Sequence, residues 1–327
     1  MRPKVYLSYP LPGDGVAALA AQCDLIVGDA GSALSADSLG AGQRSELAHC
    51  TGLVCILTDR VDAQLLDAMP ALEFVSSVSV GVDHVEVDAL TRRGIPLGHT
   101  PGVLVDATAD TAFALLLAAA RRVAEADRFV RDGQWRPERP WTPDFFLGRD
   151  VAGATLGIVG LGAIGRAVAR RAAGFGMRVL GWNRTPREVP GVESVALEEL
   201  LHASDFVSVH VALVQETRGL LDARRIGQMK PGAVLVNTAR GGIVDEDALA
   251  AALDSGHLYA AGLDVYATEP LPPQSPLLGH PRLVLAPHIG SATPRTRAAM
   301  VTRAVDNALA ALRGEAMPFC VNPEVYA

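Results

Sequence analysis

Acidic residues outnumber basic residues in this chain. The 327 residues include 36 Asp and Glu but only 29 Lys and Arg, which gives a formal net charge of −7. A surface of that sign repels polyanions, so nucleic acid and anionic membranes are excluded as the main partners. A site for an anionic ligand must therefore be built locally, from a few cations or backbone amides.

The chain also lacks a paired cysteine framework and a long hydrophobic run. Its cysteines are Cys23, Cys50, Cys55 and Cys320. The group His49, Cys50 and Cys55 does not have the spacing of a zinc site, so we expect no metal and structural cysteines. The most apolar helix, near 112–120, is too short to span a bilayer, and the N-terminus shows no signal peptide. We expect a cytoplasmic protein without a membrane partner.

Strand and helix patterns alternate along the sequence. Strand-like segments of the first hundred residues cover 5–9, 23–29, 53–59, 72–81 and 95–99, with helical stretches at 15–21 and 61–68. A long helix is expected over 106–132, where Gly133 stops it, and the last helix over 293–313. Further strand–helix units fill the chain between these two helices.

Alternation at this spacing predicts parallel sheets that are covered by helices on both faces. We expect a two-lobed α/β protein, in which a Rossmann-type doubly wound parallel sheet is inserted into a smaller flavodoxin-like α/β domain. Residues 1–99 and 290–327 would form the substrate domain and residues 100–289 the dinucleotide-binding domain. Ligands bind beyond the carboxyl ends of such strands, so we expect the site in the cleft between the lobes.

The most informative segment is ATLGIVGLGAIG, at residues 154–165. It has the pattern of a buried strand and a Gly160-x-Gly162-x-x-Gly165 turn that opens a helix. In dinucleotide-binding folds the first glycine makes the tight turn, the second lets the backbone approach a pyrophosphate, and the third allows close helix packing. The helix N-terminus adds amides and a favourable dipole. Strand, turn and helix occur together here, which is the context that supports a dinucleotide site.

The strand after this helix ends near Asn183, and its end indicates the coenzyme. NAD-binding versions place an acid there for the ribose 2′-hydroxyl. Here the residue is neutral and is followed by Arg184, Thr185 and Arg187. Guanidinium and hydroxyl groups suit a 2′-phosphate, which an acid would repel. We therefore expect NADP(H) to be preferred, with NAD(H) as the alternative; a solvated basic loop is the other explanation of this segment.

Three chemically useful side chains, Arg240, Glu269 and His288, come directly after strand-like segments. Arg binds a carboxylate with two parallel hydrogen bonds, and His exchanges a proton near neutral pH. A carboxylate beside the imidazole favours its protonated form. Singly, each has an ordinary explanation: a surface charge, a loop residue, a core histidine. Their joint placement downstream of a nucleotide motif predicts the reduction of a 2-keto acid by a nicotinamide.

Six segments occur in the order and spacing of one family: VGVDHVEVDA, DATADTAFALLLAAARR, GLGAIGRAVARR, TARGGIVDEDAL, GLDVYATEPLP and APHIGSAT. On these segments the chain resembles the D-isomer-specific 2-hydroxyacid dehydrogenases over nearly its whole length. The segments NRTPR, PLPPQSPLL and ALRGEAMP are most similar to the glyoxylate/hydroxypyruvate reductases of that family. The resemblance implies NAD(P)H-dependent reduction of glyoxylate or hydroxypyruvate to the D-2-hydroxy acid. It makes His288 the proton donor, Glu269 its carboxylate partner and Arg240 the substrate anchor.

The resemblance also implies the remaining site residues. The backbone of Val80 and Gly81 would bind the substrate carboxylate, with Ser291 beside the site. Trp141 matches a position that reaches a neighbouring subunit's active site, or else it anchors a loop. The cofactor-binding residues would be Gly160, Gly162, Ala163, Ile164, Gly165, Asn183, Arg184, Thr185, Arg187, Ala212, Thr238, Asp264 and Gly290. The helix region 106–132 would form the core of a homodimer.

Other functions share these motifs. Phosphoglycerate dehydrogenase-like and 2-ketogluconate reductase activities are enzymatic alternatives, and a nucleotide-sensing, corepressor-type binding protein is the alternative from another class. The chain departs from many relatives at Val211-Ala212, where a Cys-Pro or Cys-Ser pair is common. This change alters packing near the nicotinamide and removes no catalytic group.

Overall fold

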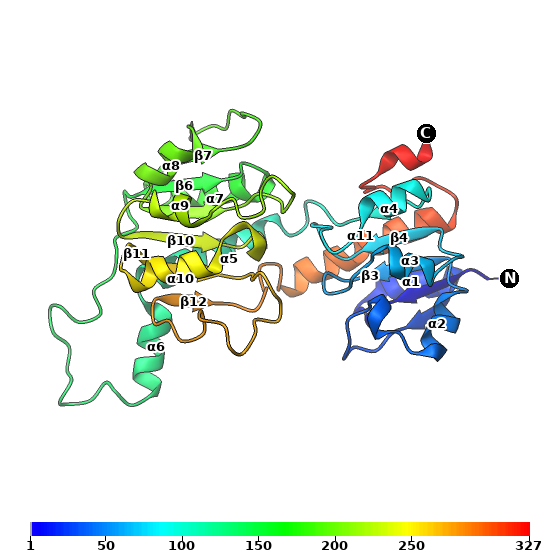
Figure 1. Ribbon diagram of the computed structural model, residues 1–327, viewed down its shortest axis with the longest axis horizontal. Coiled ribbons are helices and arrows are strands. Elements are labelled where there is room, and N and C mark those ends of the chain that lie inside the picture. Colours follow the sequence, from blue (N-terminus) through cyan, green and yellow to red (C-terminus); the bar gives the residue numbers. More distant parts are fainter. Residues whose placement is uncertain (1) are drawn as a thin grey trace. The chain divides into compact units, whose positions relative to one another are not determined.

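The computed structural model describes residues 2–327, which form two compact units (Figure 1). One unit contains the chain up to Leu104 together with Thr293–Ala327, and the other contains Val105–Ala292. Each unit has one sheet in which all paired strands are parallel. The expected α/β class is confirmed. The sequence-based limits of the second domain, residues 100–289, lie a few residues before the observed limits of the second unit, Val105–Ala292.

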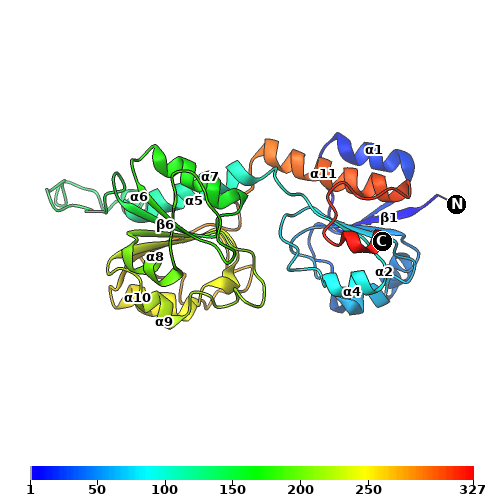
Figure 2. The ribbon, with the colours of Figure 1, turned by 90° about the horizontal axis from the view of Figure 1, so that it is seen from above.

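The first unit has five strands in the order β2-β1-β3-β4-β5, which is the flavodoxin-like order. The strands are β1 (Lys4–Leu7), β2 (Asp24–Val27), β3 (Gly52–Cys55), β4 (Phe74–Ser77) and β5 (Leu97–Gly98). Figure 2 shows α1 (Asp14–Gln22) and α11 (Pro294–Leu312) on one face, and α2 (Ala41–Leu47) and α4 (Val87–Arg92) on the other. The short helix α3 (Ala63–Asp67) precedes β4. Every residue of β3 and β4 is buried, as expected for strands covered on both faces.

The last helix returns to this first unit, as the sequence predicts. The side chain of Thr293 accepts a hydrogen bond from the Thr296 amide at 3.1 Å, and a proline follows it at the first helical position. Asn307, fully buried in α11, donates to the His99 carbonyl and accepts from the Phe319 amide, both at 3.0 Å. These bonds join the helix to the end of β5 and to the C-terminal segment.

The second unit has seven strands in the order β12-β11-β10-β9-β6-β7-β8. The strands are β6 (Thr155–Val159), β7 (Arg178–Trp182), β8 (Glu193–Ser194), β9 (Phe206–Val209), β10 (Ala233–Asn237), β11 (Leu258–Leu263) and β12 (Leu283–Leu285). Numbered from β6, this is the Rossmann order 3-2-1-4-5-6 with one further strand. Helices α5 (Val105–Ala120) and α7 (Ala163–Ala173) cover one face, and α8 (Leu197–Ala203), α9 (Ala223–Gly227) and α10 (Glu246–Asp254) cover the other (Figure 2).

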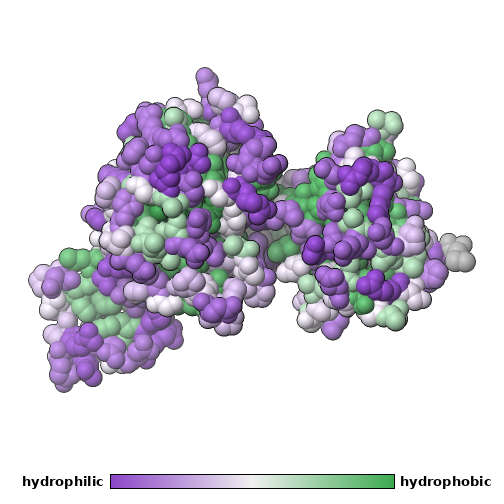
Figure 3. All heavy atoms as spheres, viewed as in Figure 1, coloured by the Kyte–Doolittle hydropathy of each residue, from purple (hydrophilic) through white to green (hydrophobic). Residues whose placement is uncertain are grey.

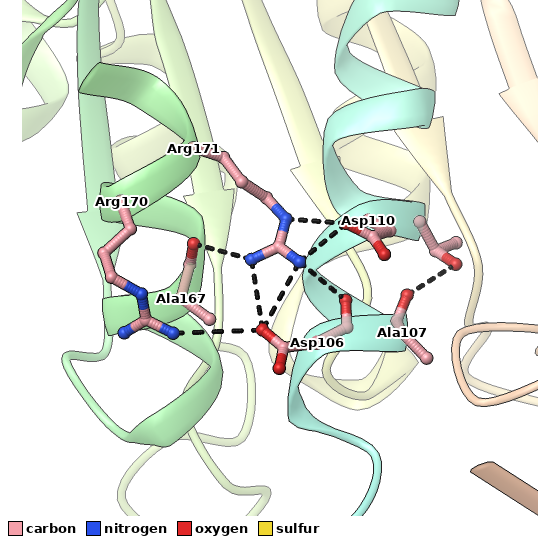
Figure 4. Close-up of polar contacts among 7 residues, drawn as sticks. Asp106, Ala107, Asp110, Ala167, Arg170 and Arg171 are labelled. Carbon is pink, nitrogen blue, oxygen red and sulfur yellow. Dashed lines mark hydrogen bonds and ion pairs between the residues drawn. The ribbon is translucent and has the colours of Figure 1, made fainter. Parts of the chain in front are cut away.

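Arg171 joins α7 to α5 (Figure 4). Its Nε donates to Asp110 at 2.7 Å, one Nη contacts Asp106 at 3.4 Å, and the other donates to the Ala167 carbonyl at 3.0 Å. Arg170 adds a longer contact to Asp106, at 3.8 Å. The acids are largely exposed, so each pair contributes at most ~1 kcal/mol. Together they hold the far end of the helix whose start carries the glycine-rich turn.

The structure divides the expected 106–132 helix in two, so the prediction of one continuous helix is wrong. Helix α5 ends at Ala120, and α6 (Val123–Arg131) begins after Arg122, whose φ of 57° is left-handed. The chain returning after α6 causes the break, because the Arg149 amide donates to the Ala120 carbonyl at 2.8 Å. That carbonyl is one of those that a continuing helix would use. Helix α6 then ends just before Gly133, at the expected place.

The structure can be searched for membrane-spanning helices, disulfides and metal sites over residues 2–327. None of the helices in this range combines the length and the apolar character that a membrane crossing requires. All four cysteines are free, and no group of three or more His, Cys, Asp or Glu side chains in the same range could hold a metal ion.

Candidate functional site

The register of the second sheet aligns the ends of six strands. The laterally paired residues in this row are Trp182, Val159, Val209, Asn237, Leu263 and Leu285. The next residues of the chain are, in the same order, Asn183, Gly160, His210, Thr238, Asp264 and Ala286. Neighbouring strands lie about 4.8 Å apart, so these six segments begin side by side along one edge. The carboxyl edge of this sheet therefore collects most of the predicted site residues.

His288 and Glu269 form a hydrogen-bonded pair at this edge. The distance from His288 Nδ1 to Glu269 Oε2 is 2.7 Å, and the side chains are 23% and 27% exposed, so a ligand can reach them. The other Glu269 oxygen accepts the Tyr266 amide at 2.9 Å. Burial raises the pKa of Glu269, but the bonds from His288 and Tyr266, with the charges of His288 and Arg240, outweigh burial and lower it. Glu269 is thus an ionised partner that orients the imidazole.

The backbone of His288 is held in an unusual conformation. Its φ of 55° lies in the left-handed region, which is uncommon for a residue other than glycine and is frequent at functional sites. The His288 amide donates to the Asp264 carbonyl at 2.9 Å, and the Asp264 carboxylate accepts the amides of Ile289 and Gly290, both at 2.7 Å. Burial raises the pKa of Asp264, against these two hydrogen bonds. Asp264 therefore holds the backbone of His288 and of the two residues that follow it.

Arg240 lies close to this pair. Its guanidinium is half-buried, donates to the Ala239 carbonyl at 2.8 Å and contributes to the lowered pKa of Glu269. The side chain of Asn237 fixes the turn, since it donates to the Arg240 carbonyl at 2.9 Å and accepts the Ala239 amide at 3.0 Å. The structure thus brings together a guanidinium, a carboxylate and an imidazole.

The three glycines of the turn after β6 have different structural roles. Gly160 has a φ of 107°, and a Cβ there would lie 2.7 Å from the carbonyl carbon of His210. A Cβ on Gly165 would lie 2.0 Å from the Gly160 carbonyl oxygen. Gly162 has an ordinary φ of −67°, and a Cβ there would meet nothing within 4 Å. Backbone packing therefore requires glycine at Gly160 and Gly165, whereas Gly162 faces open space and is not required by packing.

That open space fits the phosphates of a dinucleotide. It lies at the start of α7, which opens with Ala163 and Ile164 and has no side-chain cap, so no capping side chain occupies the amides of its first turn. Thr238 adds a second sign of a ligand: its hydroxyl is buried and has no partner in the described part of the chain. The residues present therefore suit the coenzyme that the sequence predicts.

The segment expected to bind a 2′-phosphate adjoins this turn. Asn183 connects the two, because its Oδ1 accepts the Leu161 amide at 3.2 Å and its Nδ2 donates to the Thr185 carbonyl at 2.7 Å. The exposed residues that follow include Arg184, Thr185 and Arg187. The guanidinium of Arg184 lies 3.6 Å from the Glu216 carboxylate, and both side chains are largely in solvent. The basic side chains are thus accessible to an anion.

Three more predicted residues of this unit, Ala212, Gly290 and Ser291, follow strands at the same edge. Ala212 is exposed, and its carbonyl accepts the Thr217 hydroxyl at 2.6 Å. Gly290 is held by Asp264, and Ser291 follows it as a buried residue. His210, beside the glycine turn, is bonded to Ser208 at 2.7 Å, and burial lowers its pKa to about 3, so it stays neutral.

Val80 and Gly81 belong to the first unit, in the turn after β4. The Gly81 carbonyl accepts the Ser79 hydroxyl at 2.7 Å, and the Val80 carbonyl lies 3.0 Å from Nδ1 of His99. Within residues 2–327 neither amide donates a hydrogen bond to the chain. Two successive amides are therefore available to an anion.

Trp141 lies elsewhere. It is 70% exposed, on the loop between α6 and β6. The Leu147 carbonyl of that loop accepts the hydroxyl of Tyr259, a residue at the start of β11. The loop is thus attached at the amino edge of the sheet, and the structure does not bring Trp141 to the carboxyl edge of its own chain.

The sequence pattern does not indicate Tyr266 or Glu246, yet Glu246 contacts the segment that carries Glu269 and Tyr266 contacts the segment that carries His288. The Glu246 carboxylate accepts the Ala267 amide at 2.6 Å, and the Tyr266 hydroxyl donates to the Ala286 carbonyl at 2.9 Å. In the sequence, Glu246 is an ordinary acid in the first turn of a helix capped by Asp245. Neither contact leaves a signal in the sequence, because each is made to a backbone group of another segment.

Comparison with known proteins gives consistent matches. A family model described as "D-isomer specific 2-hydroxyacid dehydrogenase, NAD binding domain" matches residues 113–290. A glyoxylate reductase of Korarchaeum cryptofilum is 51% identical over 280 residues, which is 84% of each chain. A glyoxylate reductase of Thermofilum pendens is 43% identical over 330 aligned positions, covering 99% of this chain and 96% of that protein.

Solved structures agree over nearly the whole chain. A protein of Thermus thermophilus is 45% identical with a TM-score of 0.89, over 97% of this chain and 99% of that one. An NADPH-dependent glyoxylate/hydroxypyruvate reductase of Sinorhizobium meliloti, solved with NADP and malonate, is 33% identical with a TM-score of 0.86. The match covers 99% of this chain and 98% of that one.

The different surroundings of Gly162 and Gly165 lead to opposite expectations for alanine variants. Gly162→Ala should leave Tm within about 2 °C of the wild type and raise the NADPH Kd at least tenfold, because its methyl group enters only the open space. Gly165→Ala should lower the free energy of unfolding by about 1–3 kcal/mol, because its methyl group overlaps the Gly160 carbonyl. Thermal unfolding and fluorescence titration measure both effects. Unchanged NADPH binding by Gly162→Ala would contradict the assignment.

Proposed function

Because the chain belongs to the D-isomer-specific 2-hydroxyacid dehydrogenase family, we propose that it reduces a small 2-keto acid, glyoxylate or hydroxypyruvate, to the D-2-hydroxy acid. The observation that carries this proposal is the His288–Glu269 pair beside Arg240, at the sheet edge that also carries the glycine-rich turn. Relatives named glyoxylate reductase support glyoxylate as the substrate.

The side chains divide the work of such a reduction. Arg240 binds the substrate carboxylate through the two parallel hydrogen bonds that a guanidinium offers. Bound NAD(P)H supplies the hydride. His288, held at Nδ1 by Glu269, uses Nε2 to stabilise the negative charge that develops on the carbonyl oxygen and then donates its proton there. The imidazole afterwards takes up a proton from solvent, while Glu269 stays ionised and keeps the ring oriented.

Two further groups complete the proposal. The amides of Val80 and Gly81 would give the substrate carboxylate a second set of donors, in keeping with their lack of partners within residues 2–327. Asn183, Arg184, Thr185 and Arg187 would hold the ribose 2′-phosphate, so NADP(H) would be preferred to NAD(H). The absence of an acid at the end of β7 supports this preference, since an acid there would repel the phosphate.

Substitution of His288 tests the proton donor. We expect His288→Asn to lower kcat for glyoxylate reduction by about 10²–10⁴-fold, the usual contribution of a positioned acid, with the NADPH Kd within about threefold of the wild type. Steady-state kinetics and fluorescence titration give the two values. A fall in kcat of less than tenfold would remove His288 from this role.

The coenzyme preference has its own test. The double variant Arg184→Ala/Arg187→Ala should lower kcat/KM for NADPH by about 10–100-fold, at about 1.4 kcal/mol per tenfold, and leave kcat/KM for NADH unchanged. Arg178→Ala is the matched control, because Arg178 begins the same strand, β7, and pairs with Glu193 at 2.7 Å. Equal losses with both coenzymes would show that these arginines do not read the 2′-phosphate.

We also propose that the chain forms a homodimer through the region of α5, α6 and the following loop. Large apolar side chains on α6 and this loop are more than half exposed: Val123, Val130, Trp135, Trp141 and Leu147. Figure 3 shows apolar surface over this part of the unit. Monomers rarely expose such a group, so a partner of the same chain would cover it.

Sedimentation at micromolar concentration tests the dimer. The wild type should sediment as a dimer, and Val130→Glu should shift it toward monomer because the charge would be buried at the interface. Val214→Glu, at an exposed valine on the loop between β9 and α9 and outside the proposed interface, controls for the added charge. A monomeric wild type would overturn the proposal.

A further inference from the structure

The turn Tyr266–Ala267, which follows β11, touches all three segments that carry the proposed catalytic groups. It leads to Glu269 along the chain, and it contacts the segments of His288 and Arg240 through space. Neither residue of the turn belongs to the predicted site.

Tyr266 bonds to two of these segments. Its amide donates to the Glu269 carboxylate at 2.9 Å, and its hydroxyl donates to the Ala286 carbonyl at 2.9 Å, two residues before His288. The side chain is 8% exposed. Burial raises the pKa of Tyr266 to about 12, so its hydroxyl remains a donor throughout the working range. One buried residue thus connects the carboxylate of the catalytic pair to the segment that carries its imidazole.

The third segment contacts the turn through Gly241, the residue after Arg240. A Cβ on Gly241 would lie 1.8 Å from the carbonyl carbon of Tyr266 and 2.2 Å from the Ala267 nitrogen. Such distances mean that the backbone beside Arg240 packs directly on the Tyr266–Ala267 peptide. The spacing between the guanidinium's segment and the turn is therefore set by a backbone-to-backbone contact that leaves no room for adjustment.

Glu246 joins the same two segments a second time. Only a short helix, Gly241–Ile243, followed by Val244 and the cap residue Asp245, separates it from Arg240, and its carboxylate accepts the Ala267 amide at 2.6 Å. Burial raises the pKa of Glu246, and the nearby acids Asp247, Glu269 and Asp245 add to this rise against the Ala267 hydrogen bond. The position of the turn is thus fixed from Arg240's side by one packing contact and one hydrogen bond.

We propose that Tyr266 is a positioning residue for the reaction, which holds the segments of His288, Glu269 and Arg240 at fixed separations, and that Glu246 locks the turn in place. The inference rests on the catalytic roles proposed above. Arg240 would hold the carboxylate end of the substrate and His288 its carbonyl oxygen. The separation between these two segments therefore decides whether the proton donor reaches the reacting oxygen, and displacements near 1 Å can cost about 10²-fold in rate.

Removal of one hydroxyl group tests Tyr266. Tyr266→Phe should lower kcat by about 5–20-fold, with the keto-acid KM and the NADPH Kd within about twofold, because only the contacts of the hydroxyl are lost, to the Ala286 carbonyl at 2.9 Å and to the Leu263 carbonyl at 3.4 Å. Tyr259→Phe is the matched control: Tyr259 lies in β11, the strand that leads to this turn, and its hydroxyl also donates to a backbone carbonyl, that of Leu147, at 2.9 Å. This control should keep kcat within about twofold of the wild type.

Conservative and non-conservative variants separate positioning from charge at Glu246. Glu246→Gln keeps an oxygen that can accept the Ala267 amide and should stay within about threefold of wild-type kcat, whereas Glu246→Ala should lose about tenfold. Asp247→Ala, an exposed acid at the next position, should have no effect. The double variant Tyr266→Phe/Glu246→Ala should lose less than the product of the single losses, because both act on one turn.

A readout without turnover keeps this inference separate from the proposed function. The NMR resonance of the His288 Nδ1 proton, identified with His288→Asn, reports its hydrogen bond to Glu269. It should move in Tyr266→Phe and stay in Tyr259→Phe. If the wild type does not reduce glyoxylate, the proposed function fails and the resonance still decides the positioning role. If Tyr266→Phe matches Tyr259→Phe in both kcat and this resonance, the inference is overturned.

Discussion

The alignment of parallel strand ends is the constraint on which the site depends. In the seven-stranded sheet each strand is paired so that Trp182, Val159, Val209, Asn237, Leu263 and Leu285 form one lateral row. A parallel register fixes where the chain leaves the sheet, and each exit then lies one strand spacing from the next. The glycine-rich turn and the His288–Glu269 pair belong to segments far apart in sequence, yet they share an edge because the row is aligned.

Local polar contacts then convert these exits into a defined geometry. Asp264 binds the two amides after His288, and Asn237 bonds to the backbone on both sides of the Ala239–Arg240 turn. The left-handed conformation of His288 is tolerated because its amide is bonded to the Asp264 carbonyl. Each loop is therefore tied to the strand it follows or to the neighbouring loop, so the groups are in place before any ligand binds.

Features that follow from the order and spacing of side chains in the sequence can be predicted. Alternating strands and helices predict the parallel sheets, and the three glycines predict a turn at the start of α7. The spacing of Arg240, Glu269 and His288 after strand-like segments predicts that they follow strand ends, and the structure places them there.

The parts that depend on tertiary contacts could not be predicted in this way. The break at Arg122 results from Arg149 returning to the end of α5, which a helical pattern does not show. The roles of Tyr266 and Glu246 depend on backbone groups of other segments, and backbone groups leave no trace in a pattern of side chains. Gly162 is the opposite case, because its sequence signal is clear although the fold itself does not require a glycine there.

The contact at Gly241 has a consequence for how this protein can evolve. Every amino acid other than glycine carries a Cβ, and at this position a Cβ would overlap the Tyr266 carbonyl carbon. A codon change that alters this residue therefore separates two backbone segments, whatever the chemistry of the new side chain. Substitution of Gly241 is therefore not tolerated without a shift of the backbone beside Arg240. Sequence variation among descendants of this protein has to arise at other positions along the edge.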